Sequence, residues 1–128
     1  MSQENVEIVR SFTEAYLRGD HEQALSYLAP DLVYEVEQEL PARRPDELLA
    51  MWTRWEADWE RIELTPEEYI DAGDEVVLAV RYSARARASG IELEDRLFEV
   101  HTVRDGKIAR KREFKTRSEA LEAAGLRA

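Results

Sequence analysis

The sequence contains no cysteine, which excludes disulfide bonds and thiolate chemistry. Histidine is scarce as well. The two histidines, His21 and His101, are too few and too far apart in the chain for a typical zinc site. We therefore expect a function that requires no metal.

Long apolar runs and a surplus of basic residues are also missing. No apolar run approaches the roughly 20 residues of a membrane span, and the start, MSQENVEIVR, lacks the basic and apolar regions of a signal peptide. Acidic residues outnumber basic ones by 28 to 18, and a net charge of −10 opposes binding to phosphates. We expect a cytoplasmic protein that binds neither membranes nor nucleic acid.

What is present is the balance of a globular protein. Hydrophobic residues make up 44% and charged residues 36% of the 128 residues, and the chain has no evident internal repeat. This length suits one domain with a substantial core. We therefore treat residues 1–128 as a single domain.

Helical spacing of apolar residues predicts helices in the first half of the chain. One helix is expected over 5–18, and a short one over 21–28 with Asp20 as its cap. Pro45 and the acidic residues after it suit the first turn of a third helix over 45–59. Its tryptophans, at 52, 55 and 59, are either core residues or the walls of a ligand cavity.

Alternating, β-branched segments follow. A strand is predicted over 32–37, with Leu32, Tyr34 and Val36 on one face. The remaining strands are expected over 62–71, irregular near Pro66, and over 75–88, 91–103 and 107–115, before a final helix that starts at Thr116 or Ser118. This order predicts an α+β fold in which three N-terminal helices pack on a curved antiparallel sheet.

The hairpin over residues 97–115 gathers charged residues on one strand face. A loop of three residues, Arg104 to Gly106, would pair Glu99 with Lys111 and leave His101 and Glu113 on the same face, with cross-strand Cβ atoms ~5 Å apart. A two-residue loop would instead set Glu99 opposite Arg112. In the first register we expect a Glu99–Lys111 salt bridge, and a raised pKa for Glu113 because Glu99 crowds it in an apolar wall.

Several segments together resemble a known family. They are MSQENVEIVRSF, RGD at 18–20, APDLVYEV at 29–36, EEYIDAGDEVV at 67–77, VRDGKIARKR at 103–112 and EALEAAGL at 119–126. In these segments the chain resembles the SnoaL-like branch of the nuclear transport factor two and ketosteroid isomerase-like superfamily. The resemblance implies a cone-like half barrel closed by helices around a pocket, and a small hydrophobic ligand.

The resemblance carries over catalytic residues only in part. Where ketosteroid isomerases have an oxyanion-hole tyrosine and a general-base aspartate, this chain has Phe12 and Val36, and only Glu99 matches an acidic donor. Where limonene epoxide hydrolases have their charged set, this chain has Tyr82, Val80 and Glu113. The helping residues of those hydrolases would fall on Tyr34 and Val36, so neither mechanism is reproduced whole.

The resemblance implies that the charged face of the hairpin looks into the pocket. The alternative is that Phe98, Val100, Ile108 and Phe114, on the other face, pack beneath the helices and leave the charges in water. Burial of that apolar face in a homodimer would reconcile it with an inward charged face.

Two functions follow. The first is cofactor-free acid/base chemistry, of isomerase, cyclase or hydratase/hydrolase type, on a small hydrophobic carbonyl or enol compound. Its catalytic residues would be Tyr34, Glu99, His101 and Glu113. The substrate would be bound by Phe12, Tyr16, Val36, Trp52, Trp55, Tyr82, Leu97 and Lys111, with Lys111 stabilising an oxyanion. The second is a noncatalytic module, for ligand binding or dimerisation, on the same fold.

Overall fold

A computed structural model describes residues 2–36 and 39–126. The elements follow in the order α1 (Ser2–Leu17), α2 (His21–Leu25), β1 (Leu28–Glu35), β2 (Ala42–Arg43), α3 (Arg44–Asp58), β3 (Trp59–Ala72), β4 (Glu75–Ala86), β5 (Glu92–Arg104), β6 (Lys107–Phe114) and α4 (Arg117–Ala123). Among these described elements, no helix has the length and apolar character needed to cross a membrane.

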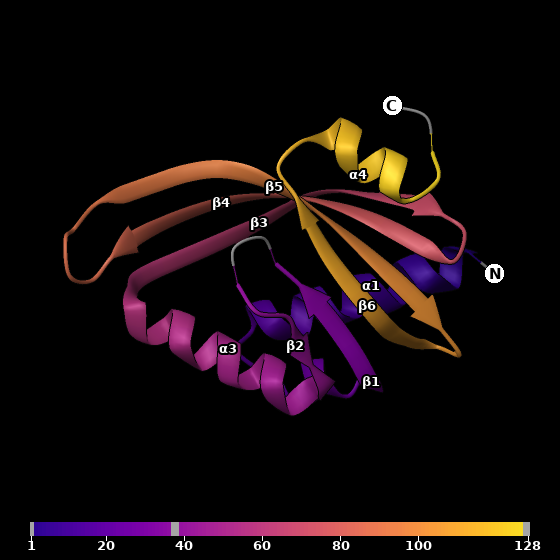
Figure 1. The fold of residues 1–128 in the computed structure, drawn as a ribbon, viewed down its shortest axis with the longest axis horizontal. Coiled ribbons are helices and arrows are strands. Elements are labelled where there is room, and N and C mark those ends of the chain that lie inside the picture. Colours follow the sequence, from indigo (N-terminus) through magenta and orange to yellow (C-terminus); the bar gives the residue numbers. More distant parts are fainter. Residues whose placement is uncertain (1, 37–38, 127–128) are drawn as a thin grey trace.

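The strands form one six-stranded sheet in the order β2-β1-β6-β5-β4-β3. It is curved and open, with α1 and α3 on one side and α4 on the other (Figure 1). The α+β class is confirmed, but the sheet is mixed because β1 runs parallel to β6. Three N-terminal helices around a cone are not confirmed: α1 is the one long helix in the described chain before β1, and α3 follows β2.

Most predicted elements lie near their expected places. Asp20 caps α2 by accepting a hydrogen bond from the backbone of Gln23 at 3.1 Å, as predicted, but the helix ends at Leu25. The predicted first strand begins at Leu28, four residues early, and its expected end at residue 37 lies outside the described residues. β3 shifts register between Pro66 and Glu68, which agrees with the irregularity expected near Pro66.

The two sides of the sheet carry separate apolar clusters. On the inner side, residues of α1 and α3 such as Val9 and Leu48 pack with Leu32, Val76 and Ile108. On the outer side, Ala120 and Leu121 of α4 pack against Val77 and Val100, with Phe98 and Phe114 at the edge. α4 therefore packs over part of this apolar outer face, and Phe98 and Phe114 beside it stay partly exposed.

The β5–β6 hairpin adopts neither predicted register. Its loop has two residues, Asp105 and Gly106, both in the left-handed region with φ of 52° and 75°. Beyond Thr102 the register shifts by one residue, so Glu99 lies opposite Glu113 and His101 opposite Lys111. This bulge at Ala109 keeps those four side chains on one face and moves Ile108 to the inner face, where an unbroken alternation would not place it.

Candidate active site

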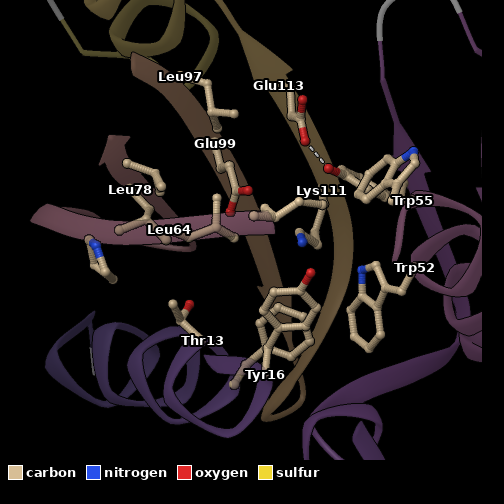
Figure 2. A pocket seen from close by; sticks show the side chains of 15 residues that line it. Thr13, Tyr16, Trp52, Trp55, Leu64, Leu78, Leu97, Glu99, Lys111 and Glu113 are labelled. Atoms are coloured by element: carbon tan, nitrogen blue, oxygen red, sulfur yellow. Dashed lines mark hydrogen bonds between the residues drawn. The ribbon is translucent and has the colours of Figure 1, made fainter. Parts of the chain in front are cut away.

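A cavity of about 110 Å³ lies between the inner face of the sheet and helices α1 and α3. Its walls are mostly apolar; the charged Glu99, Lys111 and Glu113 lie on the sheet side, and Thr13 and Tyr16 lie on the α1 side (Figure 2). It is lined by Phe12, Thr13, Tyr16, Tyr34, Trp52, Trp55, Ile62, Leu64, Pro66, Leu78, Val80, Leu97, Glu99, Lys111 and Glu113. The charged face of the hairpin therefore looks inward.

One end of the polar side is built around Glu99, whose side chain is 16% exposed. Its Oε1 lies 2.8 Å from Nε2 of His101, a ring that is completely buried. Burial alone would raise the pKa of Glu99, but the Lys111 charge and the His101 hydrogen bond outweigh it and lower the pKa to about 2. Glu99 is therefore a carboxylate at neutral pH.

His101 is held in its neutral form. Burial lowers its pKa, although Glu99 opposes the shift. Its Nδ1 is buried with no hydrogen-bond partner in the described chain, so a proton there would be unsatisfied. The neutral tautomer that carries its proton on Nε2 donates it to Glu99 and leaves no unsatisfied proton on Nδ1.

Lys111 does not form the predicted salt bridge. Within the described residues, no hydrogen bond or ion pair to its ammonium is found, and Glu99 reaches it only as a nearby charge. The Nζ atom instead lies 4.8 Å from the ring centroid of Phe12 and 4.4 Å from that of Tyr34. Burial lowers the pKa of Lys111, and Glu99 counteracts this.

The other end of the polar side is a pair of Tyr34 and Glu113. The hydroxyl of Tyr34 donates to Oε2 of Glu113, the bond drawn as a dashed line ending on Glu113 in Figure 2. Burial raises the pKa of Glu113 to about 7. The raised pKa was predicted, but its cause is desolvation and not crowding by Glu99.

Aromatic rings form the wall opposite these groups. Tyr16 and Trp52 lie 4.7 Å apart between ring centroids, and Trp55 meets Tyr34 edge-on at 6.4 Å. Burial, with smaller contributions from Glu56 and Glu99, raises the pKa of Tyr16 to about 12, so its hydroxyl remains protonated. Trp52 and Trp55 belong both to the core and to the cavity wall, so the two interpretations of the tryptophans do not exclude each other.

Three predicted site residues lie away from this cavity. His101 is buried behind Glu99 and is not among the described lining residues, because its short side chain ends in the core beside Phe12. Val36 and Tyr82 line a neighbouring recess that shares Leu97 and Glu113 with the cavity. Tyr82 stands further along β4 than the cavity extends, opposite Asp95.

Sequence reasoning missed the walls supplied by β3 and β4. Ile62, Leu64 and Pro66 alternate along β3, while Leu78 and Val80 do so along β4. The β4 pair was detectable, because Leu78 and Val80 share a strand face with Tyr82. Ile62 and Leu64 also alternate with charged and polar residues, but the register shift after Pro66 breaks the pattern beyond them.

Comparison with known proteins identifies the fold independently. The family model described as a SnoaL-like domain matches residues 9–111. Similar solved structures include an NTF2-like protein from Burkholderia thailandensis, with 25% identity, a TM-score of 0.81 and coverage of 94% of this chain and 95% of that one. A proposed SnoaL-like polyketide cyclase from Jannaschia has 21% identity, a TM-score of 0.77 and coverage of 95% and 91%. No curated protein matches the chain.

Proposed function

Because the chain belongs to the SnoaL-like family, we propose that its pocket performs cofactor-free acid/base chemistry on a small hydrophobic compound with a carbonyl or enol group. One observation carries the proposal. A carboxyl group with a pKa of about 7, Glu113, is hydrogen-bonded to Tyr34 and faces an apolar cavity. A group that titrates near the working pH can both take and return a proton.

In this mechanism Glu113 removes a proton from the carbon next to the substrate carbonyl. The Lys111 ammonium stabilises the oxyanion that develops, and Tyr34 holds the Glu113 carboxylate in place. Return of the proton at another carbon would give isomerisation, and attack by the enolate carbon on a second carbonyl would give cyclisation. Glu99 remains ionised and balances the Lys111 charge, while His101 positions Glu99 without touching substrate.

The structural neighbours support this proposal only at the level of fold. The polyketide cyclase description belongs to the Jannaschia protein, which shares 21% of its residues with this chain. The chemistry is therefore argued from the residues of this pocket. We also propose that the protein forms a homodimer, which analytical ultracentrifugation of the purified chain would test.

Hydrogen exchange at carbon tests the proposed chemistry without knowledge of the natural substrate. The chain would be incubated in heavy water with cyclohexanone, and loss of the α-proton signal followed by NMR. We expect the protein to accelerate exchange over buffer, with a rate that rises through pH 7 as Glu113 ionises. Glu113→Gln should slow the protein-dependent exchange by about 10²- to 10⁴-fold.

The matched control is Glu94→Gln, which neutralises an exposed carboxylate on β5 outside the cavity lining. It should exchange at the parent rate. Equal rates for the parent and Glu113→Gln, or no acceleration over buffer, would contradict the proposal.

A noncatalytic ligand-binding module is the second candidate. It is favoured by Phe12, whose ring covers the Lys111 ammonium and offers no hydroxyl to a substrate oxygen. Calorimetric binding of a cyclic ketone that is unchanged in Glu113→Gln, without exchange in either protein, would support this function in place of catalysis.

A further inference from the structure

Lys111 stands apart from the other lysines of the chain. It is 4% exposed, and no hydrogen bond or ion pair to another described residue engages its amine. Lys107 and Lys115, by contrast, are exposed, and Lys107 donates to the backbone carbonyl of Ser26 at 2.6 Å. A buried amine without a dedicated partner is a poor structural element, because desolvation of its charge is not repaid by a bond.

The surroundings of this amine suit a nucleophile. Lys111 reaches from β6 toward the middle of the pocket in Figure 2, where its Nζ lies over the faces of Phe12 and Tyr34. Burial among apolar groups increases the neutral fraction of a lysine, and only the neutral amine attacks carbon. The Tyr34–Glu113 pair lines the same cavity and supplies a proton donor and acceptor.

We propose that Lys111 forms a Schiff base with an aldehyde or an unhindered ketone that enters this cavity. The inference rests on the proposed function in one respect, that the pocket accepts carbonyl compounds. It replaces the oxyanion-stabilising role of the Lys111 ammonium with a covalent intermediate, keeps Glu113 as the proton-transfer group, and restricts the substrate class to carbonyls that an amine can reach.

The reaction balances without a further reactant. The nitrogen lone pair of neutral Lys111 attacks the carbonyl carbon, and proton transfer from nitrogen to oxygen gives a carbinolamine. Protonated Glu113 donates its proton to the carbinolamine hydroxyl, which leaves as water while the nitrogen lone pair forms the C=N bond. The product is a protonated imine, and the released water accounts for the carbonyl oxygen.

The same neighbours that hold the ammonium would hold the protonated imine. Its positive charge would lie near the Phe12 and Tyr34 ring faces, with the Glu99 carboxylate balancing it. The apolar walls limit the water that would hydrolyse the imine. A protonated imine also withdraws electrons more strongly than a neutral carbonyl, so it would ease the α-proton removal assigned to Glu113.

Reductive trapping tests the imine directly. The full chain would be incubated with benzaldehyde and sodium cyanoborohydride near pH 7, and the benzylated lysine located by peptide mass spectrometry. We expect several-fold more label on Lys111 than on Lys107 and Lys115, because burial lowers the pKa of Lys111 and so increases its neutral, reactive fraction. Selectivity should disappear in urea, where all lysines are exposed.

Variants sharpen the result. Lys111→Arg should remove the selective label, whereas Lys107→Arg should retain it. The distribution of label over the lysines of the parent protein tests the proposal even if Lys111→Arg does not fold. Label spread evenly over the lysines of the folded parent, or selective label that persists at other positions in Lys111→Arg, would overturn the proposal.

Benzaldehyde has no α-proton, so its trapping is independent of proton exchange. Exchange of cyclohexanone without trapping at Lys111 would overturn the Schiff base and leave the acid/base function standing. Trapping at Lys111 without any exchange would support the Schiff base and overturn the acid/base function. The two proposals therefore fail separately.

Discussion

The two ends of the polar wall carry the same functional group in opposite states. Glu99 and Glu113 lie directly opposite each other on neighbouring strands, yet the pKa of one falls to about 2 and that of the other rises to about 7. Glu99 has a cation and an imidazole beside it, whereas Glu113 has a phenol and apolar walls. The difference teaches that the immediate neighbours set the role of a carboxyl group, and that position in the sheet does not.

The different protonation states of Glu99 and Glu113 also explain how two carboxyl groups can lie opposite each other across the sheet. Like charges directly opposite each other across a sheet destabilise it. Below pH 7 most Glu113 is protonated, so the pair carries a single negative charge, which Lys111 balances. The wall is therefore electrically neutral in mildly acidic solution.

The largest effect expected is on the pH dependence of stability. The pKa of Glu113 is raised from 4.5 to about 7, so the folded chain keeps a proton that the unfolded chain loses, and stability falls as pH rises through that window. The full loss is about 3 kcal/mol above pH 7. Glu113→Gln should abolish this fall and be the more stable protein at pH 8, as measured by urea denaturation followed through tryptophan fluorescence.

Glu99 should affect the pH dependence of stability in the opposite direction. Its pKa is lowered from 4.5 to about 2, so its contribution is present above pH 4.5 and is lost as pH falls toward 2. Glu99→Gln should remove that acid-side loss and leave the fall between pH 4.5 and 7 in place. If Glu99→Gln and Glu113→Gln change stability over the same pH range, the two carboxyl groups do not have the opposite pKa shifts described above.

A smaller effect is expected from the hydroxyl that contacts Glu113. Tyr34→Phe removes a donor that favours the carboxylate, so the pKa of Glu113 should rise and the midpoint of the exchange-rate profile should move to higher pH. The rate at pH 7 should fall by about three- to tenfold, since a hydrogen bond to a charged group contributes roughly 1 kcal/mol or more. Tyr82→Phe, outside the cavity lining, is the control, and an unmoved midpoint would count against the pair.

The smallest effect should come from the loop that sets the carboxylates opposite each other. Gly106 has φ of 75°, so Gly106→Ala should destabilise the fold by about 1 kcal/mol. Asp105→Asn should be nearly neutral, because asparagine tolerates the left-handed conformation of that position. Neither should shift the midpoint of the exchange-rate profile, and a shift would mean that the loop controls the electrostatics of the wall.

Local patterns predicted much of this structure. Helical spacing, the Asp20 cap and the strand alternation placed most elements within a few residues of their observed positions. The inward face of Glu99, Lys111 and Glu113 was expected from alternation combined with the family resemblance. These features depend on near neighbours in the chain, which a sequence displays directly.

Features that depend on distant or irregular contacts were not predictable in the same way. The bulge at Ala109 combines with a two-residue loop to produce a pairing that neither loop length alone would give. The parallel contact of β1 with β6 joins segments from opposite ends of the chain. The burial of His101 follows from packing against Phe12 in α1, which alternation along β5 cannot reveal.

The short helix α4 has a consequence for a cavity that none of its described residues line. Ala120 and Leu121 cover Val77 and Val100 from behind, on the strands whose opposite side carries Val76, Glu99 and His101. α4 thus packs directly behind the strands that carry the proposed acid and base groups. If the proposed chemistry holds, substitutions in α4 that loosen this packing would change the spacing of Glu99 and Glu113, so a screen for altered activity should recover positions outside the cavity lining.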